Sequence, residues 1–241
     1  MPERALLLRS GDESDPYEEA LEADGFAVDS LAVLSFDVVH GEALRSALEH
    51  PNSYDGLILT SPRAVDALGD ALPWLPAENM LWHNKASFAV GPRTADALRS
   101  IGFEPQGEES GSAEMLADLI CGLTFRRPLL FLCGNRRREV LPDRLHEAGV
   151  DFEEICVYVS RPRSDLNWPI GRRPDWIVFF SPSGYEAVRQ AHRANLGGAR
   201  IAAIGATTAA ALRSDGWEVA AVAMEPSPAG LRAAIRSAAG R

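Results

Sequence analysis

The same short pattern occurs in both halves of the sequence, and this repetition limits the folds that the chain can form. The stretches "LILTSPRAVDAL" (57–68) and "IVFFSPSGYEAV" (177–188) each lead from an apolar run through a Ser-Pro turn into a segment with helical spacing. Such units are typical of folds in which helices surround a parallel sheet. The sequence therefore predicts an α/β protein.

Other apolar runs extend the repeat and keep its order. Residues 5–11 align with 129–135, and residues 88–103 align with 201–217, so each half contains three units of the same kind. We interpret this as an internal duplication that forms two parallel-sheet α/β domains. A β-rich segment follows the first unit of each half, and either one is suited to connect the domains: 31–39 and 154–162.

Composition excludes several classes of protein. With 241 residues, 46% of them hydrophobic, the chain is long enough for one large domain or two small ones. The net charge of −10 argues against a general nucleic-acid-binding protein. No apolar run reaches the roughly 18–20 residues of a membrane span, and the first residues lack the features of a signal peptide. Cys121, Cys133 and Cys156 show no C-x-x-C spacing, so we expect a cytoplasmic protein without disulfides or zinc.

Four Ser/Thr-rich turns lie where strands are expected to end and helices to begin. At such a place the first N–H groups of the helix, a capping hydroxyl and the helix dipole all favour an anion. The alternative is that each hydroxyl only caps its helix, with Pro at the first helical position. The turns are 60–62, 91–94, 181–184 and 205–208.

The signatures of several other chemistries are absent from the sequence. It contains no G-x-G-x-x-G or phosphate-loop motif, and its five histidines do not have metal-ligand spacing. Ser61 lies outside any G-x-S-x-G motif, which makes it a poor candidate nucleophile. Arg136, Arg137 and Arg138 follow a strand, where they either bind a carboxylate or phosphate or form a solvated helix start. We therefore expect catalysis to depend on positioning, electrostatics and a general acid.

Tyr158, in the second β-rich segment, is the candidate general acid. A phenol is protonated at neutral pH and can donate its proton to a departing oxygen. The alternative is an aromatic side chain that only fills a strand position.

These segments together resemble the uroporphyrinogen-III synthases, most closely the animal-type branch of that family. The resemblance covers essentially the whole chain, and it implies a hydro-lyase of tetrapyrrole (heme) biosynthesis. The matching segments are "DPYEEAL", "LSFDVV", "LILTSPRAV", "LLFLCGNRRREVLP", "VYVS", "FFSPSG", "AAIGATTAAAL" and "EPSPAGL".

The resemblance also implies a domain organisation. It gives two α/β domains, joined by two connecting β segments, with the active site in the cleft between them. Residues 1–34 and 163–241 form a discontinuous domain 1 and residues 38–157 form domain 2, which leaves 35–37 and 158–162 as the connecting segments. The leading unit of each half then packs with the later units of the opposite half.

The reaction implied by the resemblance converts hydroxymethylbilane, a linear tetrapyrrole with acetate and propionate side chains, to uroporphyrinogen III. Water leaves to give an azafulvene, the substituted position of the terminal ring attacks through a spiro intermediate, and that ring is inverted on reclosure. No cofactor and no metal are implied. We expect a monomer that binds this small molecule, contacts the upstream bilane synthase transiently, and binds neither nucleic acid nor membrane.

Matching motifs transfer functional roles to individual residues. Tyr158 corresponds to the tyrosine proposed to assist departure of the hydroxyl, and Arg63 and Arg93 are added because they stand beside two of the turns. The other residues expected to bind substrate are Ser61, Thr94, Ser181, Ser183, Gly205, Thr207 and Thr208.

Two other functions remain open from the residues alone. One is a noncatalytic module that binds a tetrapyrrole or another polyanion, which would bind tightly without cyclising its ligand. The other is an unrelated two-domain transferase acting on a phosphorylated sugar, which the lack of a phosphate-loop motif disfavours.

Overall fold

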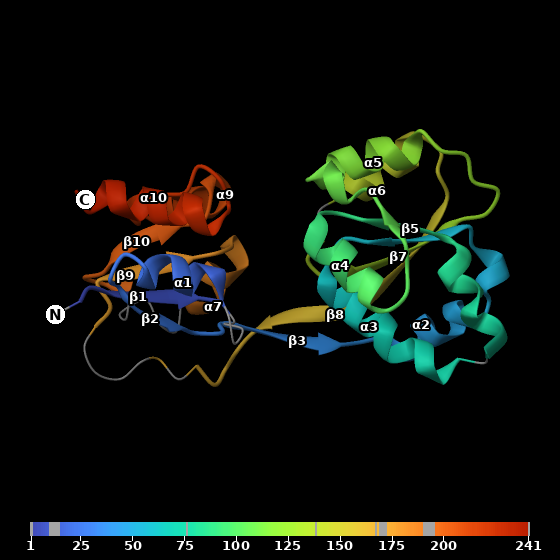
Figure 1. Ribbon diagram of the computed structural model, residues 1–241, viewed down its shortest axis with the longest axis horizontal. Coiled ribbons are helices and arrows are strands. Elements are labelled where there is room, and N and C mark those ends of the chain that lie inside the picture. The colour runs from blue at the N-terminus through green and yellow to red at the C-terminus, as the bar shows by residue number, and fades with distance from the viewer. Residues whose placement is uncertain are drawn as a thin grey trace. The chain divides into compact units, whose positions relative to one another are not determined.

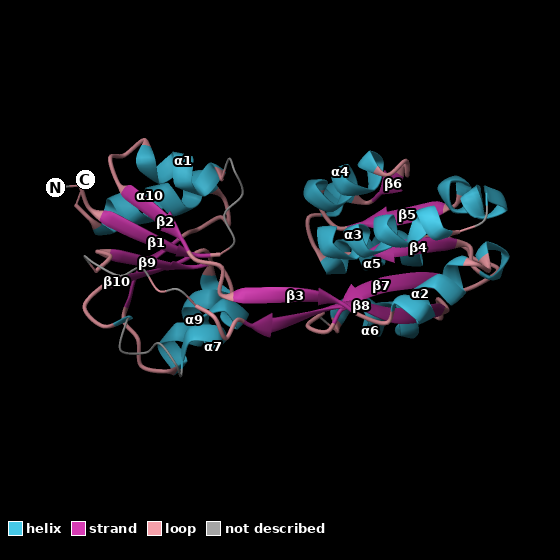
Figure 2. Cartoon of the chain, turned by 90° about the horizontal axis from the view of Figure 1, so that it is seen from below, coloured by secondary structure: helices cyan, strands magenta, loops and turns pink. Residues whose placement is uncertain are grey.

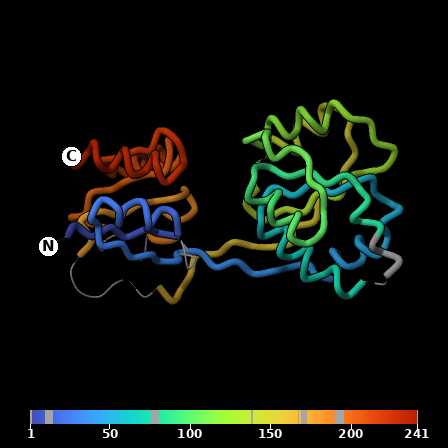
Figure 3. Tube along the Cα trace, viewed as in Figure 1, coloured from blue at the N-terminus to red at the C-terminus, as the bar shows by residue number. Residues whose placement is uncertain are grey.

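The chain folds into two compact units, as seen in a computed structural model. Unit 1 comprises residues 1–35 and 161–241, and unit 2 comprises residues 36–160. Unit 1 therefore contains both ends of the colour scale in Figure 1, and the trace in Figure 3 passes from one unit to the other twice. The structure describes residues 2–9, 15–75, 77–137, 139–166, 168, 173–189 and 196–240. Arg138 and residues 10–11, the end of the aligned segment 5–11, lie outside these ranges.

Unit 1 is built on a five-stranded parallel sheet with the order β11-β10-β9-β1-β2. Alternate residues of the central strands enter two separate cores, because successive side chains of a strand point to opposite faces. Helices α1 and α10 cover one face, and α7 and α9 cover the other (Figure 2). The strands are β1 (Arg4–Leu8), β2 (Ala27–Ser30), β9 (Trp176–Phe179), β10 (Arg200–Ala203) and β11 (Val219–Val222), and the helices are α1 (Pro16–Glu22), α7 (Pro182–Arg189), α9 (Ala206–Ser214) and α10 (Pro228–Ala238).

Unit 2 repeats this plan with one additional strand, in the order β3-β8-β7-β4-β5-β6. Helices α5 and α6 cover one face of the sheet, whereas α2, α3 and α4 cover the other (Figure 1). The strands are β3 (Leu34–Val38), β4 (Gly56–Leu59), β5 (Ala86–Ala89), β6 (Pro105–Gln106), β7 (Leu129–Gly134) and β8 (Phe152–Pro162), and the α-helices are α2 (Gly41–Leu48), α3 (Pro62–Ala71), α4 (Pro92–Ser100), α5 (Ala113–Cys121) and α6 (Val140–Glu147). Four 3-10 helices complete the described elements: η1 (Pro51–Ser53), η2 (Leu72–Trp74), η3 (Ala77–Asn84) and η4 (Glu108–Ser110).

The two sheets have equivalent strand orders. β2-β1-β9-β10-β11 in unit 1 corresponds to β8-β7-β4-β5-β6 in unit 2, so each unit combines the leading strands of one half with the later strands of the other. The chain order reverses between β1 and β9 in one sheet and between β7 and β4 in the other. In open α/β sheets, ligands bind at the carboxyl ends of the strands beside such a reversal.

The predicted α/β class is confirmed, with one correction to the predicted parallel sheets. The sheet of unit 2 is mixed, because β3 runs antiparallel to β8 (Figure 2). Two hydrogen bonds show the direction: the N–H of Val39 donates to the carbonyl of Val157, and the N–H of Arg163 donates to the carbonyl of Val33. An edge strand can take either direction, because it pairs on one side only. Among the described helices, none combines the length and apolar character needed to cross a membrane.

Candidate active site

Two of the four predicted turns cap their helices with a serine hydroxyl. At the start of α3, the Oγ of Ser61 accepts a hydrogen bond of 3.2 Å from the N–H of Arg63. At the start of α7, the Oγ of Ser181 accepts one of 3.0 Å from the N–H of Gly184, and it lies 3.1 Å from the Oγ of Ser183. The capping alternative therefore describes the local role of both hydroxyls, which satisfy N–H groups that the helix leaves unpaired.

The other two turns begin with glycine and provide no capping side chain. Gly91 precedes α4 with φ 75°, a conformation that favours glycine, and Gly205 precedes α9 in an extended conformation. Thr94 and Thr208 are the third residues of these helices, with exposures of 3% and 4%. Within the described ranges, no residue forms a hydrogen bond with either threonine hydroxyl, so the first turn of each helix presents donors that an external anion can use.

A cavity of about 290 Å³ lies within unit 2, at the carboxyl ends of β4, β5 and β7. It is therefore beside the order reversal of this sheet, where a ligand is expected. Its apolar wall is made by Val90, Phe131 and Leu141. Its polar lining consists of Thr60, Ser61, Ser112, Arg136, Arg137 and Tyr158.

The described arginines of the cavity have different partners. Arg137 contacts Glu139 and Glu154, with its Nε 2.6 Å from a carboxylate oxygen of Glu154. The hydrogen bonds to Glu139 and Glu154 raise the pKa of Arg137, and its charge is already balanced. Arg136 is exposed, and it forms no ion pair with any part of the chain that the structure describes. Arg136 is thus the cation of this cavity that is available to a carboxylate of a ligand.

Tyr158 lines this cavity, and its ring lies against Gly134, which also lines it. A Cβ atom on Gly134 would stand 2.3 Å from the nearest ring atom of Tyr158, so the contact requires glycine. The Tyr158 ring is also 6.3 Å from the ring of Phe36, and the guanidinium of Arg63 lies 3.4 Å from the centre of the Phe36 ring. The Tyr158 hydroxyl forms no hydrogen bond with a described residue, which leaves it free to donate to a ligand.

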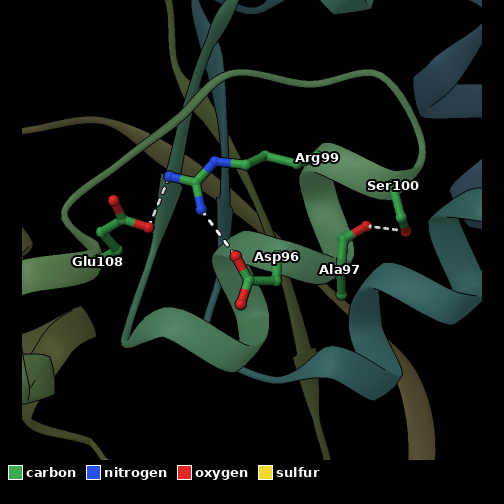
Figure 4. A network of polar contacts seen from close by, with 5 residues as sticks. All are labelled: Asp96, Ala97, Arg99, Ser100 and Glu108. Atoms are coloured by element: carbon green, nitrogen blue, oxygen red, sulfur yellow. Dashed lines mark hydrogen bonds and ion pairs between the residues drawn. The ribbon is translucent and has the colours of Figure 1, made fainter.

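Ser112, which lines the cavity, is the N-cap of α5. The segment before it, η4, is bound to α4 by an ion pair. Arg99 of α4 donates to Asp96 at 2.9 Å and to Glu108 at 2.6 Å, as Figure 4 shows. The hydrogen bond that Arg99 donates to Glu108 is the main cause of the raised pKa of Arg99. This network links the last turn of α4 to η4, the short helix just before the cavity-lining residues.

The structure brings some of the predicted site residues together and places others elsewhere. Ser61 and Tyr158 both line the cavity of unit 2. The guanidinium of Arg63 lies over the ring of Phe36, and that ring is in turn a neighbour of the Tyr158 ring. Arg93 and Thr94 start α4 in the same unit but do not line this cavity. The remaining predicted residues belong to unit 1, where neighbouring strands β9 and β10 lead into their two turns: Ser181, Ser183, Gly205, Thr207 and Thr208.

Arg136 and Ser112 are cavity residues that the sequence did not single out for substrate binding. The run of three arginines was a signal for Arg136, but it did not separate a ligand-binding arginine from one paired within the protein. The described residues contain no group of three or more His, Cys, Asp or Glu suited to a metal ion.

Comparisons with known proteins point to one family. Residues 3–233 match the family model described as uroporphyrinogen-III synthase HemD. The uroporphyrinogen-III synthase of Schizosaccharomyces pombe is 33% identical over 247 residues, which cover 96% of this chain and 95% of the yeast protein. That of Saccharomyces cerevisiae is 31% identical, with 76% of each chain covered.

Solved structures agree at the level of the fold. The crystal structure of uroporphyrinogen-III synthetase from Helicobacter pylori superposes with a TM-score of 0.72 at 20% identity, covering 98% of this chain and 99% of the other. A mutant uroporphyrinogen III synthase from Thermus thermophilus gives a TM-score of 0.62 at 21% identity, with 98% of each chain covered.

Proposed function

The chain belongs to the uroporphyrinogen-III synthase family, and we propose on this basis that it cyclises hydroxymethylbilane to uroporphyrinogen III. It is then a lyase of tetrapyrrole and heme biosynthesis. The observation that carries the proposal for the site is the cavity of unit 2, which combines the Tyr158 hydroxyl, the Arg136 guanidinium and an apolar wall. That the chain belongs to the animal-type branch of this family remains a prediction.

The cavity matches the chemistry of a pyrrole with acidic side chains. Val90, Phe131 and Leu141 offer an apolar surface to the ring, while Arg136 and the helix starts at Ser61 and Ser112 offer positive charge and donors to carboxylates. A protein with a net charge of −10 can bind a polyanion in this way, because the local field decides binding.

In this proposal Tyr158 is the general acid for loss of water. Its phenol donates a proton to the hydroxyl of the substrate as the carbon–oxygen bond breaks, and water departs. The pyrrole then gives up its N–H proton to solvent to form the neutral azafulvene, and solvent returns a proton to the phenolate, so protons and charge balance. The protein then holds the terminal ring in the orientation that favours attack by its substituted position, because the bilane can also close without inversion.

The other predicted residues remain part of the proposal. Ser181, Ser183, Gly205, Thr207 and Thr208 are assigned to substrate carboxylates, supported by the two adjoining helix starts of unit 1. Thr94 is supported by its hydroxyl, which has no partner among the described residues. We also propose that residues 1–34 and 163–241 form domain 1 and that residues 38–157 form domain 2. The limits of the two compact units, 1–35 with 161–241 and 36–160, support this division.

We also infer a monomeric, cytoplasmic enzyme without a cofactor, in transient contact with the synthase that supplies its substrate.

The functional test generates hydroxymethylbilane with that synthase, adds this protein, oxidises the products and separates type I from type III uroporphyrin. Type III in excess over the control without protein is the expected result. Type I alone, at the spontaneous rate and with a folded protein, would instead favour the noncatalytic binding module.

A further inference from the structure

Strand β8 contains an irregularity just before Tyr158. Cys133 of β7 is paired with Cys156, but the next residue of β7, Gly134, is paired with Tyr158. Val157 is thus an extra residue, as in a β-bulge, which bends a strand and redirects its side chains. The bulge brings the Tyr158 ring over Gly134, where a side chain at Gly134 would collide with it.

Residues just after β3 form hydrogen bonds with this bulge on the side of β8 that faces β3. The N–H of Val39 donates to the carbonyl of Val157 at 2.9 Å, and Nδ1 of His40 lies 2.9 Å from the carbonyl of Cys156. Since a carbonyl only accepts, Nδ1 carries the proton. His40 has φ 53° and is the one non-glycine residue with positive φ in the part of the chain described. A conformation that costs free energy is thus retained beside the bulge.

Asn135, which directly follows β7, binds β8 on its opposite side, the side that faces β7. Its backbone N–H donates to the carbonyl of Tyr158 at 3.1 Å, and its side-chain Oδ1 accepts from the N–H of Ser160 at 2.8 Å. In a regular parallel ladder the backbone carbonyl of the same residue would take the second bond. Here the side-chain carbonyl replaces it, so the pairing of β7 with β8 continues past the end of β7.

We propose that Asn135 is a positioning residue for Tyr158. Its two hydrogen bonds, to the carbonyl of Tyr158 and from the N–H of Ser160, hold the backbone of β8 in place where the phenol enters the cavity. The proposal rests on the role of Tyr158 given above. It also explains an amide at this position, because aspartate could accept the same bond but would place a negative charge beside a site for carboxylates.

A double-mutant cycle tests the proposal. Asn135→Ala is measured in the wild-type chain and in Tyr158→Phe, by the single-turnover rate of type III formation. If Asn135 acts through the phenol, we expect the rate to fall ~10-fold in the wild type and less than ~2-fold in Tyr158→Phe, since coupled residues are not additive. A merely structural role would slow both backgrounds equally. Thermal unfolding of each variant separates loss of stability from loss of rate.

Two further variants complete the test. Asn135→Asp keeps the acceptor, so its rate at saturating substrate should stay near the wild type while its KM rises through charge repulsion. Asn52→Ala, an exposed asparagine of unit 2 away from the cavity, is the matched control and should leave both values unchanged.

Each outcome has a separate meaning. Equal rate losses in both backgrounds, or a rate for Asn135→Asp as low as for Asn135→Ala, overturn the positioning role alone. A wild-type rate in Tyr158→Phe overturns the role of Tyr158 as the acid, and the positioning role with it.

Discussion

The ring of Tyr158 lies so close to the Cα atom of Gly134 that a methyl group there would come within 2.3 Å of it. Gly134 ends a buried strand, and Tyr158 comes from the neighbouring strand after a change of register. The position of the candidate acid therefore depends on a residue without a side chain.

Gly134→Ala should displace the Tyr158 ring and slow turnover by about 10²-fold, the scale expected for a misplacement of about 1 Å. Gly41→Ala is the matched control, because a Cβ at Gly41 would meet nothing within 4 Å. The turnover number and the melting temperature of both variants check this. Normal turnover in Gly134→Ala would mean that the position of the ring is unimportant.

Arg136→Gln should raise KM about 10-fold, which corresponds to about 1.4 kcal/mol, because it removes a charge-assisted hydrogen bond to a substrate carboxylate. The turnover number should change less. Arg45→Gln removes an exposed arginine of α2 in the same unit and serves as the control. Equal KM values for the two variants would exclude Arg136 from substrate binding.

Ser61→Ala and Thr208→Val should have opposite profiles. Ser61 caps α3, so its loss should lower the free energy of unfolding by about 1 kcal/mol. Thr208 has no described hydrogen-bond partner, so Thr208→Val should leave stability nearly unchanged but weaken substrate binding by about 1–3 kcal/mol. Urea unfolding and KM measurements distinguish them. Normal kinetics in Thr208→Val would show that its hydroxyl does not bind the substrate.

Asp55 should contribute to the loss of stability in acid. Its carboxylate accepts hydrogen bonds from the N–H groups of Arg126 at 2.6 Å and Arg127 at 3.0 Å, and the first of these is the main cause of its lowered pKa. A carboxyl group with a lower pKa in the folded state stabilises the protein above its unfolded pKa, and this contribution disappears as pH falls through the folded pKa. Asp55→Asn should therefore reduce the dependence of unfolding free energy on pH in the acid range. An unchanged dependence would contradict this assignment.

Much of the fold could be predicted from the sequence, because the repeated apolar runs specify buried strands followed by helices. The faces of those strands could not. Leu57 and Leu59 enter one core of unit 2 and Ile58 enters the other, but all three are apolar, so no alternation marks the two faces. The direction of β3 could not be predicted either, because it depends on pairing with β8, a strand more than a hundred residues later.

The site was predictable to a more limited extent. Tyr158 and the serine turns could be identified from local motifs, whereas the distinction between Arg136 and Arg137 could not. Arg137 is neutralised partly by Glu154, which the parallel pairing of β7 with β8 brings close to it. The sequence contains both residues but not their proximity. The change of register that places Tyr158 on Gly134 is likewise a property of strand pairing.

The most direct test of this account is the single-turnover rate of type III formation by Tyr158→Phe at saturating hydroxymethylbilane, compared with the wild type. Phenylalanine keeps the ring on Gly134 but removes the proton donor, so the account predicts a rate about 10²-fold lower in a protein of unchanged stability. A rate equal to that of the wild type would contradict the assignment of Tyr158 as the general acid.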